Sequence, residues 1–164
     1  MPPFNSALIS VHTTINAPPA KVRAFLLDFS NLPNWSKCQR IIDAISIERP
    51  TGNDDESSIV PGIEAQAGDI ARVISRQAGE VRPVISENTP MRFGYKGSGM
   101  GFYVVHYWEF LPSPEGDGKT LLAHCEAFEG GLAFLNWRYG PLRGWIEGLF
   151  RGFNEDLKAG VEGS

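Results

Sequence analysis

A chain of 164 residues fits one domain, and at this length a protein buries about 70% of its unfolded surface, so a core forms without disulfides or metals. Hydrophobic residues make up 42% and charged residues 21%, as is usual for globular proteins. The net charge is −4 and no run of Lys or Arg exceeds two residues, which excludes the electrostatic footprint of a nucleic-acid-binding protein.

The cysteines and the N-terminal sequence predict a cytoplasmic location. Cys38 and Cys125 are the only cysteines and form no CxxC motif, so zinc and thioredoxin-type sites are excluded and free thiols in a reducing compartment are expected. The N-terminus lacks the basic and apolar regions of a signal peptide, and no stretch approaches about 18 apolar residues. We therefore expect no stable membrane insertion. A monomer or a homodimer is expected, and the sequence does not decide between them.

The chain is predicted to begin with a strand followed by short helices. Residues 7–16 alternate in polarity and are rich in β-branched residues, which predicts a strand with an exposed His12 on its polar face. The Ala-Pro-Pro sequence that follows predicts a helix over 19–29, because proline is favoured in the first helical turn. A turn or a short second helix is expected at 30–36.

The middle of the chain is rich in short strands. The polar segment 49–62 predicts a long surface loop, either a lid over a binding site or a solvated insertion. Glycines at 97–101 precede a strand and not a helix, so they predict a turn and no phosphate-binding loop. Six strands are predicted after the short helices, at 38–48, 69–76, 81–88, 91–95, 102–111 and 120–129.

The C-terminal part predicts one long amphipathic helix. Apolar residues recur at steps of three or four from Leu135 to Leu157, over about 25 residues, with a kink or restart at Pro141. Gly144, Gly148 and Gly152 lie four residues apart, and a glycine inside a helix costs about 1 kcal/mol. Close packing of the helix on the sheet is the expected reason for them.

This order of elements predicts an α+β helix-grip fold over residues 1–164, as one ligand-binding domain. A curved antiparallel sheet of about seven strands wraps around a long C-terminal helix, and two short helices follow the first strand. No alternation of strands and helices is present, which excludes a parallel doubly wound sheet. Because one helix cannot fill a strongly curved sheet, we expect an apolar cavity between them.

Three polar residues are the candidates for catalysis. His106 lies on the same predicted strand face as Trp108, and His124 and Glu126 share a face of the next strand. If the two strands pair as a hairpin, these side chains come within reach of one another. An apolar pocket shifts carboxyl and imidazole pKa values toward working pH, which suits acid and base catalysis. The alternatives are that this face points outward or that the three residues only satisfy one another.

Aromatic residues are the candidates for the cavity wall. They favour flat, conjugated or polycyclic ligands, and Tyr and Trp add polar groups to the wall. The predicted ligand-binding residues are Trp35, Phe93, Tyr95, Phe102, Tyr103, Trp108, Phe128, Leu135 and Tyr139. No metal motif, P-loop or nucleophile elbow is present, so neither a metal nor a cofactor is expected.

Two segments resemble a known family. The opening TTINAPPAKVRAFLLDFSNLPNWS, with Asp28, Phe29, Pro33 and Trp35, looks like the start of the START/Bet v 1-like (SRPBCC) superfamily, in its polyketide cyclase/dehydratase and lipid-transfer group. HYWEF, then TLLAHCEAFEGGL and a helix containing FNEDLK, is similar to bacterial and fungal members. The resemblance implies the helix-grip fold, but this superfamily includes carriers, receptors, cyclases and dehydratases.

Three functions follow from this interpretation. The first is a cofactor-independent cyclase or dehydratase of secondary metabolism, a lyase or isomerase that acts on a polyketide- or terpenoid-type substrate. Glu126, His106 and His124 would transfer protons, and Tyr95 or Tyr103 would hydrogen-bond a carbonyl. The second is a non-catalytic carrier of a lipid-like ligand. The third is a protein-interaction domain of the co-chaperone kind, which the sequence favours least.

Overall fold

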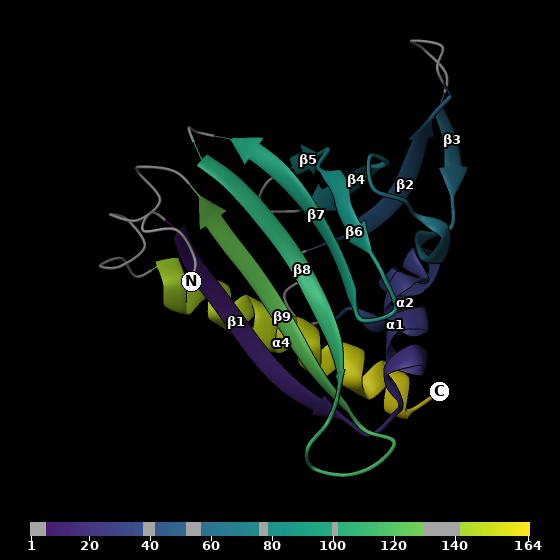
Figure 1. Cartoon of the computed structure of the whole chain (residues 1–164), viewed down its shortest axis with the longest axis vertical. Helices are drawn as coiled ribbons and strands as arrows, with labels where there is room; N and C mark the ends of the chain where they lie inside the picture. The colour runs from purple at the N-terminus through teal and green to yellow at the C-terminus, as the bar shows by residue number, and fades with distance from the viewer. Residues whose placement is uncertain (1–5, 38–41, 52–56, 76–78, 100–101, 130–141) are drawn as a thin grey trace.

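The computed structural model describes residues 6–37, 42–51, 57–75, 79–99, 102–129 and 142–164. Within them one curved antiparallel sheet lies against helix α4, and α1 and α2 pack at one end (Figure 1). The strands run in the order β1-β9-β8-β7-β6-β4-β2-β3, and β5 pairs with β4. This is the predicted helix-grip fold.

The elements follow the predicted order along the chain. The strands are β1 (Ser6–Ile15), β2 (Ala44–Pro50), β3 (Ser57–Val60), β4 (Ile70–Ser75), β5 (Gly79–Val81), β6 (Val84–Asn88), β7 (Arg92–Gly99), β8 (Phe102–Pro112) and β9 (Thr120–Glu129). The helices are α1 (Pro19–Leu27), α2 (Leu32–Trp35) and α4 (Leu142–Glu162), with 3-10 turns η1 (Phe29–Asn31) and η2 (Gly62–Glu64). As predicted, α1 begins at a proline after Ala-Pro.

The sheet has nine strands in the described residues, which corrects the prediction of about seven. The predicted loop 49–62 is wrong in part, because β2 extends to Pro50 and β3 pairs with it as an edge strand. The side chains of β3 are mostly exposed, so its sequence lacks the apolar alternation of a half-buried strand. β5 was missed because it has three exposed residues. The predicted strand 38–48 begins only at Ala44, and residues 38–41 lie outside the described part.

The pairing of β8 with β9 is continuous. Ten successive pairs run from Tyr103 opposite Glu129 to Pro112 opposite Thr120, without a bulge. The alternation of side chains is therefore preserved along both strands, and His106, Trp108 and His124 point toward α4, a direction that the sequence had left open. A register shift does occur in the sheet, between Ile85 and Glu87 of β6, away from this pair.

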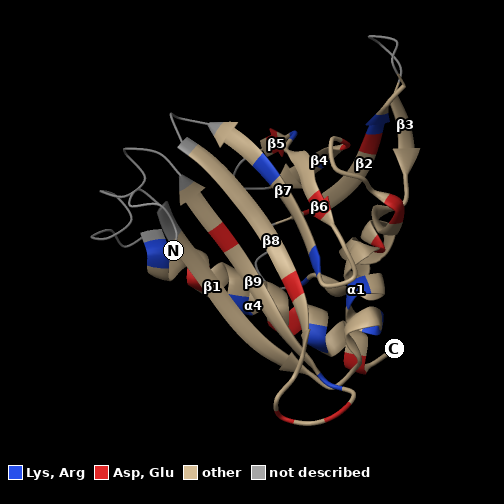
Figure 2. Cartoon of the chain, in the orientation of Figure 1, with Lys and Arg blue, Asp and Glu red and all other residues tan. Residues whose placement is uncertain are grey.

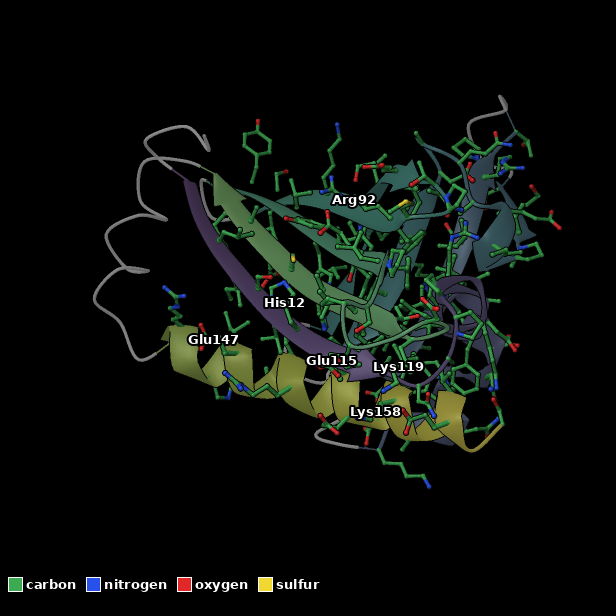
Figure 3. The ribbon with its side chains drawn as sticks, turned by 60° about the horizontal axis from the view of Figure 1, so that its bottom comes forward. His12, Arg92, Glu115, Lys119, Glu147 and Lys158 are labelled. Atoms are coloured by element: carbon green, nitrogen blue, oxygen red, sulfur yellow. The ribbon has the colours of Figure 1, made fainter. Side chains whose placement is uncertain are left out.

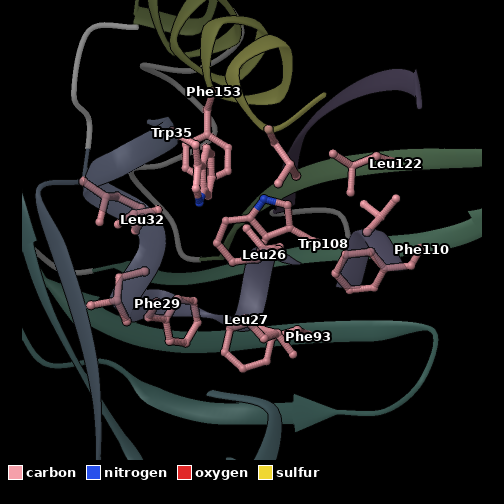
Figure 4. Packing of buried hydrophobic residues seen from close by; sticks show 14 of the residues in the cluster. Leu26, Leu27, Phe29, Leu32, Trp35, Phe93, Trp108, Phe110, Leu122 and Phe153 are labelled. Carbon is pink, nitrogen blue, oxygen red and sulfur yellow. The ribbon is translucent and has the colours of Figure 1, made fainter. Parts of the chain in front are cut away.

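The core lies between the sheet, α4 and the short helices. Figure 3 shows side chains in the space between the sheet and α4, on which Glu147 and Lys158 are labelled. Trp108 stacks on Phe93, with ring centroids 6.1 Å apart, and Trp35 packs edge-on against Phe153 of α4 at 5.3 Å (Figure 4). These large side chains fill the end of the molecule near α1 and α2. None of the helices in the described ranges has both the length and the apolar character needed to cross a membrane.

Two of the three glycines do not have the predicted role in α4. Gly144 and Gly148 are exposed, and a Cβ atom added at either would meet no described residue within 4 Å, so these two do not bring the helix close to the sheet. The close contact is made by Gly160, where a Cβ would lie 2.8 Å from the ring of Phe25. The predicted helix start at Leu135 and the kink at Pro141 lie outside the described residues.

Replacing two glycines of the same helix with alanine tests this placement. We expect Gly148→Ala to raise the free energy of unfolding by about 0.5–1 kcal/mol, because alanine has the higher helix propensity and the site is open. Gly160→Ala has the same gain in propensity, but its methyl group must displace Phe25, so we expect no gain or a loss. Urea unfolding of both variants measures the difference. Equal effects would contradict the packing described here.

Candidate functional site

A chain of hydrogen-bonding side chains crosses the interior between the sheet and α4. The register places His106 opposite Glu126, and His124 opposite Trp108. His106 Nδ1 lies 3.5 Å from Glu126 Oε1, and His106 Nε2 lies 2.8 Å from His124 Nε2. His124 Nδ1 lies 2.9 Å from Oδ1 of Asn154 in α4. We call Glu126, His106, His124 and Asn154 the polar chain.

The three residues predicted for catalysis are therefore neighbours. The register also explains why: a hairpin without a bulge keeps both strand faces in step, so residues two apart on β9 reach the same side of β8. Charged side chains are sparse on β1, β8 and β9 (Figure 2). On the face of β8 and β9 that carries the histidines, residues 104–110 and 122–128 include Glu126 as the only charged residue.

Aromatic rings enclose the two imidazoles. Tyr95 of β7 stacks on His106 with centroids 5.1 Å apart and planes 9° apart. Phe150 of α4 stacks on His124 with centroids 3.9 Å apart and planes 7° apart. Trp108 lies against both imidazoles, at 4.5 Å from His106 and 5.0 Å from His124. Such packing fixes the ring planes and excludes water from the imidazole faces.

Burial decides the charge of His124. Desolvation lowers its pKa well below the usual value, the neighbouring His106 lowers it further, and the hydrogen bond with Asn154 opposes the shift. His124 is therefore neutral at physiological pH. Burial also raises the pKa of Tyr95, with a smaller contribution from the charge of Glu126, so Tyr95 keeps its hydroxyl proton.

The polar chain has a closed end and a more open end. Asn154 and His124 are fully buried, with 0% and 2% of their surface exposed. The side chain of His106 is 11% exposed and that of Glu126 is 17% exposed. Exposure therefore rises along the polar chain from Asn154 to Glu126.

The predicted wall residues have different positions. Phe93 and Trp108 are buried in the core beside the polar chain, and Tyr95 lies against His106. Trp35 is buried against Phe153, whose ring also contacts His124. Phe128 is partly buried and packs on the cluster of Ile9, Val11, Leu149 and Phe150. The side chain of Phe102, and residues Leu135 and Tyr139, lie outside the described part.

The prediction for Tyr103 does not hold. Tyr103 is 64% exposed and lies on the face of β8 opposite to that of His106, because neighbouring residues of a strand point to opposite sides. The same outer face carries Tyr107, over whose ring Arg92 lies at 4.5 Å, and Glu109, which pairs with Arg92. Tyr103 is therefore not part of the wall around the polar chain.

Two indole groups in the interior have no acceptor. Nε1 of Trp35 and Nε1 of Trp108 are buried without a hydrogen-bond partner in the part of the chain that the structure describes (Figure 4). A buried N–H without an acceptor costs free energy. The Trp108 indole lies beside both imidazoles, so it is a donor available to a carbonyl oxygen of a ligand.

A separate hollow of about 660 Å³ lies between α1 and the β2–β3 hairpin. Its wall is mostly apolar and includes Leu27, Phe29, Ile45, Ile47, Ile59 and Ile63. Part of the segment predicted as a possible lid, residues 59–62, borders this hollow. None of the residues of the polar chain lines it, so its wall lacks the candidate acid and base.

Metal binding has no support in the described residues, which contain no group of three or more His, Cys, Asp or Glu side chains placed to hold a metal ion. Cys125 is free and buried on the other face of β9, where its Sγ lies 3.3 Å from Ser10 Oγ. His12 is exposed, as predicted.

Sequence reasoning missed Asn154 and Phe150, the two contributions of α4 to the site. Phe150 was predicted only as part of the apolar face of the helix, and Asn154 was given no role within FNEDLK. One signal was available, because Asn154 follows Phe153 and precedes Leu157 at helical spacing, so it borders the buried stripe.

Comparison with known proteins identifies the family. A family model described as polyketide cyclase / dehydrase and lipid transport matches residues 6–162, nearly the whole chain. The chain belongs to this family. Membership implies that it binds a hydrophobic ligand, and the family description includes both enzymes and lipid carriers. No curated protein sequence gives a significant match.

Solved structures share the fold. The Zhui aromatase/cyclase from Streptomyces superposes with a TM-score of 0.65 at 12% identity, over 96% of this chain and 94% of that chain. Norcoclaurine synthase from Thalictrum flavum gives 0.62 at 10% identity, over 95% and 93%. A START superfamily protein from Mycobacterium smegmatis gives 0.60 at 17% identity, over 94% and 97%. At these identities the similarity extends to the fold alone.

The lowered pKa of His124 predicts how stability depends on pH. Between the folded pKa and the unfolded value of 6.5, the unfolded chain binds a proton that folded His124 does not bind. We therefore expect His124 to reduce the free energy of unfolding by up to about 1.4 kcal/mol for each pH unit below that value, with no contribution above it.

Urea unfolding between pH 7.5 and 5.5 measures this slope. His124→Gln keeps a hydrogen-bond donor for Asn154 but does not titrate, so we expect a flatter dependence on pH. His12→Gln is the matched control, since His12 is exposed, and should leave the slope unchanged. A slope that survives in His124→Gln would contradict a neutral buried imidazole.

Proposed function

We propose that the chain is a cofactor-independent cyclase or dehydratase acting on a polyketide- or terpenoid-type substrate. The single observation that carries the proposal is the polar chain inside an aromatic enclosure. Placing two imidazoles and a carboxylate in an apolar interior is unfavourable unless each is paired, and binding a lipid-like ligand does not need them. A proton-transferring site does need them.

An aldol cyclisation followed by loss of water suits these groups. Glu126 and His106, at the more open end, remove a proton from a substrate methylene between two carbonyls. The resulting enolate carbon forms a C–C bond to the carbon of a more distant carbonyl in the same substrate. The new alkoxide takes up a proton to become a hydroxyl. Removal of another α-proton then expels that hydroxyl, with a proton, as water.

Other groups support the same step. The unpaired Trp108 indole N–H and the protonated hydroxyl of Tyr95 are donors for the oxygen on which negative charge develops. The stacked rings of Tyr95, Trp108 and Phe150 favour a folded, flat substrate. Holding the substrate in a reactive conformation supplies much of the rate enhancement. The family description names polyketide cyclases and dehydrases, and it supports this class of substrate and reaction.

A carrier function is the second candidate. It is favoured by the lipid-transport part of the family description and by the fact that the buried His124 has its hydrogen bonds satisfied on both ring nitrogens. In that case the polar chain would only hold α4 against the sheet.

Substitution at the open end separates the two candidates. The test compound is a linear poly-β-ketone thioester of N-acetylcysteamine, whose cyclised products are separated by liquid chromatography. The fluorescent dye 1-anilinonaphthalene-8-sulfonate reports the binding of an apolar molecule to the protein. We expect Glu126→Gln and His106→Phe each to lower the protein-dependent cyclised product by about 10²-fold or more, since general acid–base catalysis contributes on that scale. We expect the Kd of the dye to change less than about threefold.

Matched controls are Glu109→Gln and His12→Phe, which change the same residue types on the outer face. Both should keep wild-type product formation. Unchanged product in both site variants would show that the catalytic assignment is wrong. Dye binding without any protein-dependent product from the wild type would favour the carrier.

A further inference from the structure

Asn154 occupies an unusual place for an asparagine. It lies in α4 between Phe153 and Leu157, with none of its surface exposed. Its side chain reaches two elements at once: His124 of β9, and Val11 and Thr13 of β1. A fully buried amide inside a helix is expected only where all its hydrogen bonds have partners.

Its partners fix which way the amide points. The backbone carbonyl of Val11, 3.4 Å away, can only accept a hydrogen bond, so the NH₂ group of Asn154 must face it. The same NH₂ group donates to Thr13 Oγ1 at 3.1 Å. The amide oxygen therefore faces His124 Nδ1, at 2.9 Å. A flipped amide would place two oxygens against each other at Val11.

The orientation of the amide determines the proton positions along the polar chain. Because the oxygen of Asn154 can only accept, His124 must carry its proton on Nδ1. A neutral His124 then has a lone pair on Nε2. His106 Nε2, 2.8 Å away, must be the donor to that lone pair. His106 Nδ1 faces Glu126 Oε1, and the hydrogen bonds of the other residues in the polar chain do not require a proton on this nitrogen.

We propose that Asn154 is a positioning residue that directs the one mobile proton of the site to the pair formed by His106 Nδ1 and Glu126. His106 Nδ1 and Glu126 Oε1 then face each other as two acceptors, so a proton that enters the site is held between them. Asn154 touches no ligand and acts through His124 and His106. This inference rests on the proposed function, to which it adds where the transferable proton is held.

The other proton order is unfavourable. It would place the positive charge on His124, while a neutral His106 would donate a hydrogen bond from Nδ1 to Glu126. His124 is the more deeply buried of the two imidazoles, with stacked Phe150 on one side, and the pKa shift given above opposes a charge there. Among the residues that the structure describes, the groups that face it are His106, Trp108, Phe150, Phe153 and Asn154, and none of these carries a negative charge. The proton therefore stays at the more open end.

Nuclear magnetic resonance of ¹⁵N-labelled histidine tests the proton order without any substrate. The chain has only three histidines, and exposed His12 is an internal reference for free tautomer exchange. At pH 7.5 we expect the long-range ¹H–¹⁵N spectrum to show His124 protonated on Nδ1 and unprotonated on Nε2, and His106 protonated on Nε2. An Nε2-protonated His124 in the wild type would overturn the inference.

Two variants test the part of Asn154. In Asn154→Leu the acceptor is lost, so we expect His124 to become a mixture of tautomers and His106 to lose its fixed Nε2 proton. Asn154→Asp keeps an acceptor and adds a negative charge, so we expect His124 to keep its Nδ1 proton and to become an imidazolium at a higher pH than in the wild type. Wild-type histidine signals in both variants would overturn the inference, and Asn154→Asp decides alone if the leucine variant does not fold.

This result is separable from the proposed function. If the histidine signals have the expected order but the thioester is not cyclised, the positioning role holds and the catalytic proposal fails. If cyclisation occurs while His124 is protonated on Nε2, the catalytic proposal holds and the role of Asn154 is wrong.

Discussion

The structure depends on one constraint: the side-chain amide of Asn154, buried between α4 and the sheet, needs hydrogen-bond partners. Asn154 satisfies this constraint with two bonds to β1 and one to β9, and it thereby sets the rotation of α4 about its own axis. The same rotation turns Phe150 onto His124 and Phe153 toward Trp35 and Trp108. An apolar residue at this position could make none of these directional hydrogen bonds, so the buried amide adds specificity to the packing of α4.

Much of this site is visible in the alternation of the sequence. β8 and β9 are long, regular and joined by a short turn, so period-two alternation was enough to place His106, His124 and Glu126 on one side. The same alternation places Tyr103 on the opposite face of β8 from His106, so predicting Tyr103 as a ligand-binding residue was inconsistent with it. The position of Asn154 beside the buried stripe was visible in the helical spacing, but its hydrogen bonds to His124, Val11 and Thr13 could not be predicted, because a contact between a helix and a sheet depends on packing over the whole domain. The edge strand β3 was missed because it has no buried face to give it a pattern.

The polar chain also bears on the choice between enzyme and carrier. The fold and the family description are compatible with both. A carrier tolerates a histidine pair as a structural element. It gains nothing from proton positions that leave a transferable proton between His106 and Glu126, at the more open end. That order, and the unpaired indole of Trp108 beside it, are properties that a catalyst uses. The hollow beside α1 has apolar walls and none of these groups.

The most direct test of the account is a crystal structure of the protein with a stable polycyclic aromatic polyketide bound. We expect the ligand between α4 and the sheet, with an oxygen within about 3.2 Å of Glu126 or His106, a normal hydrogen-bond distance. The Trp108 indole N–H should then point to a second ligand oxygen. A ligand found only in the hollow between α1 and the β2–β3 hairpin, or bound in the interior with no polar atom near Glu126 and His106, would contradict the account.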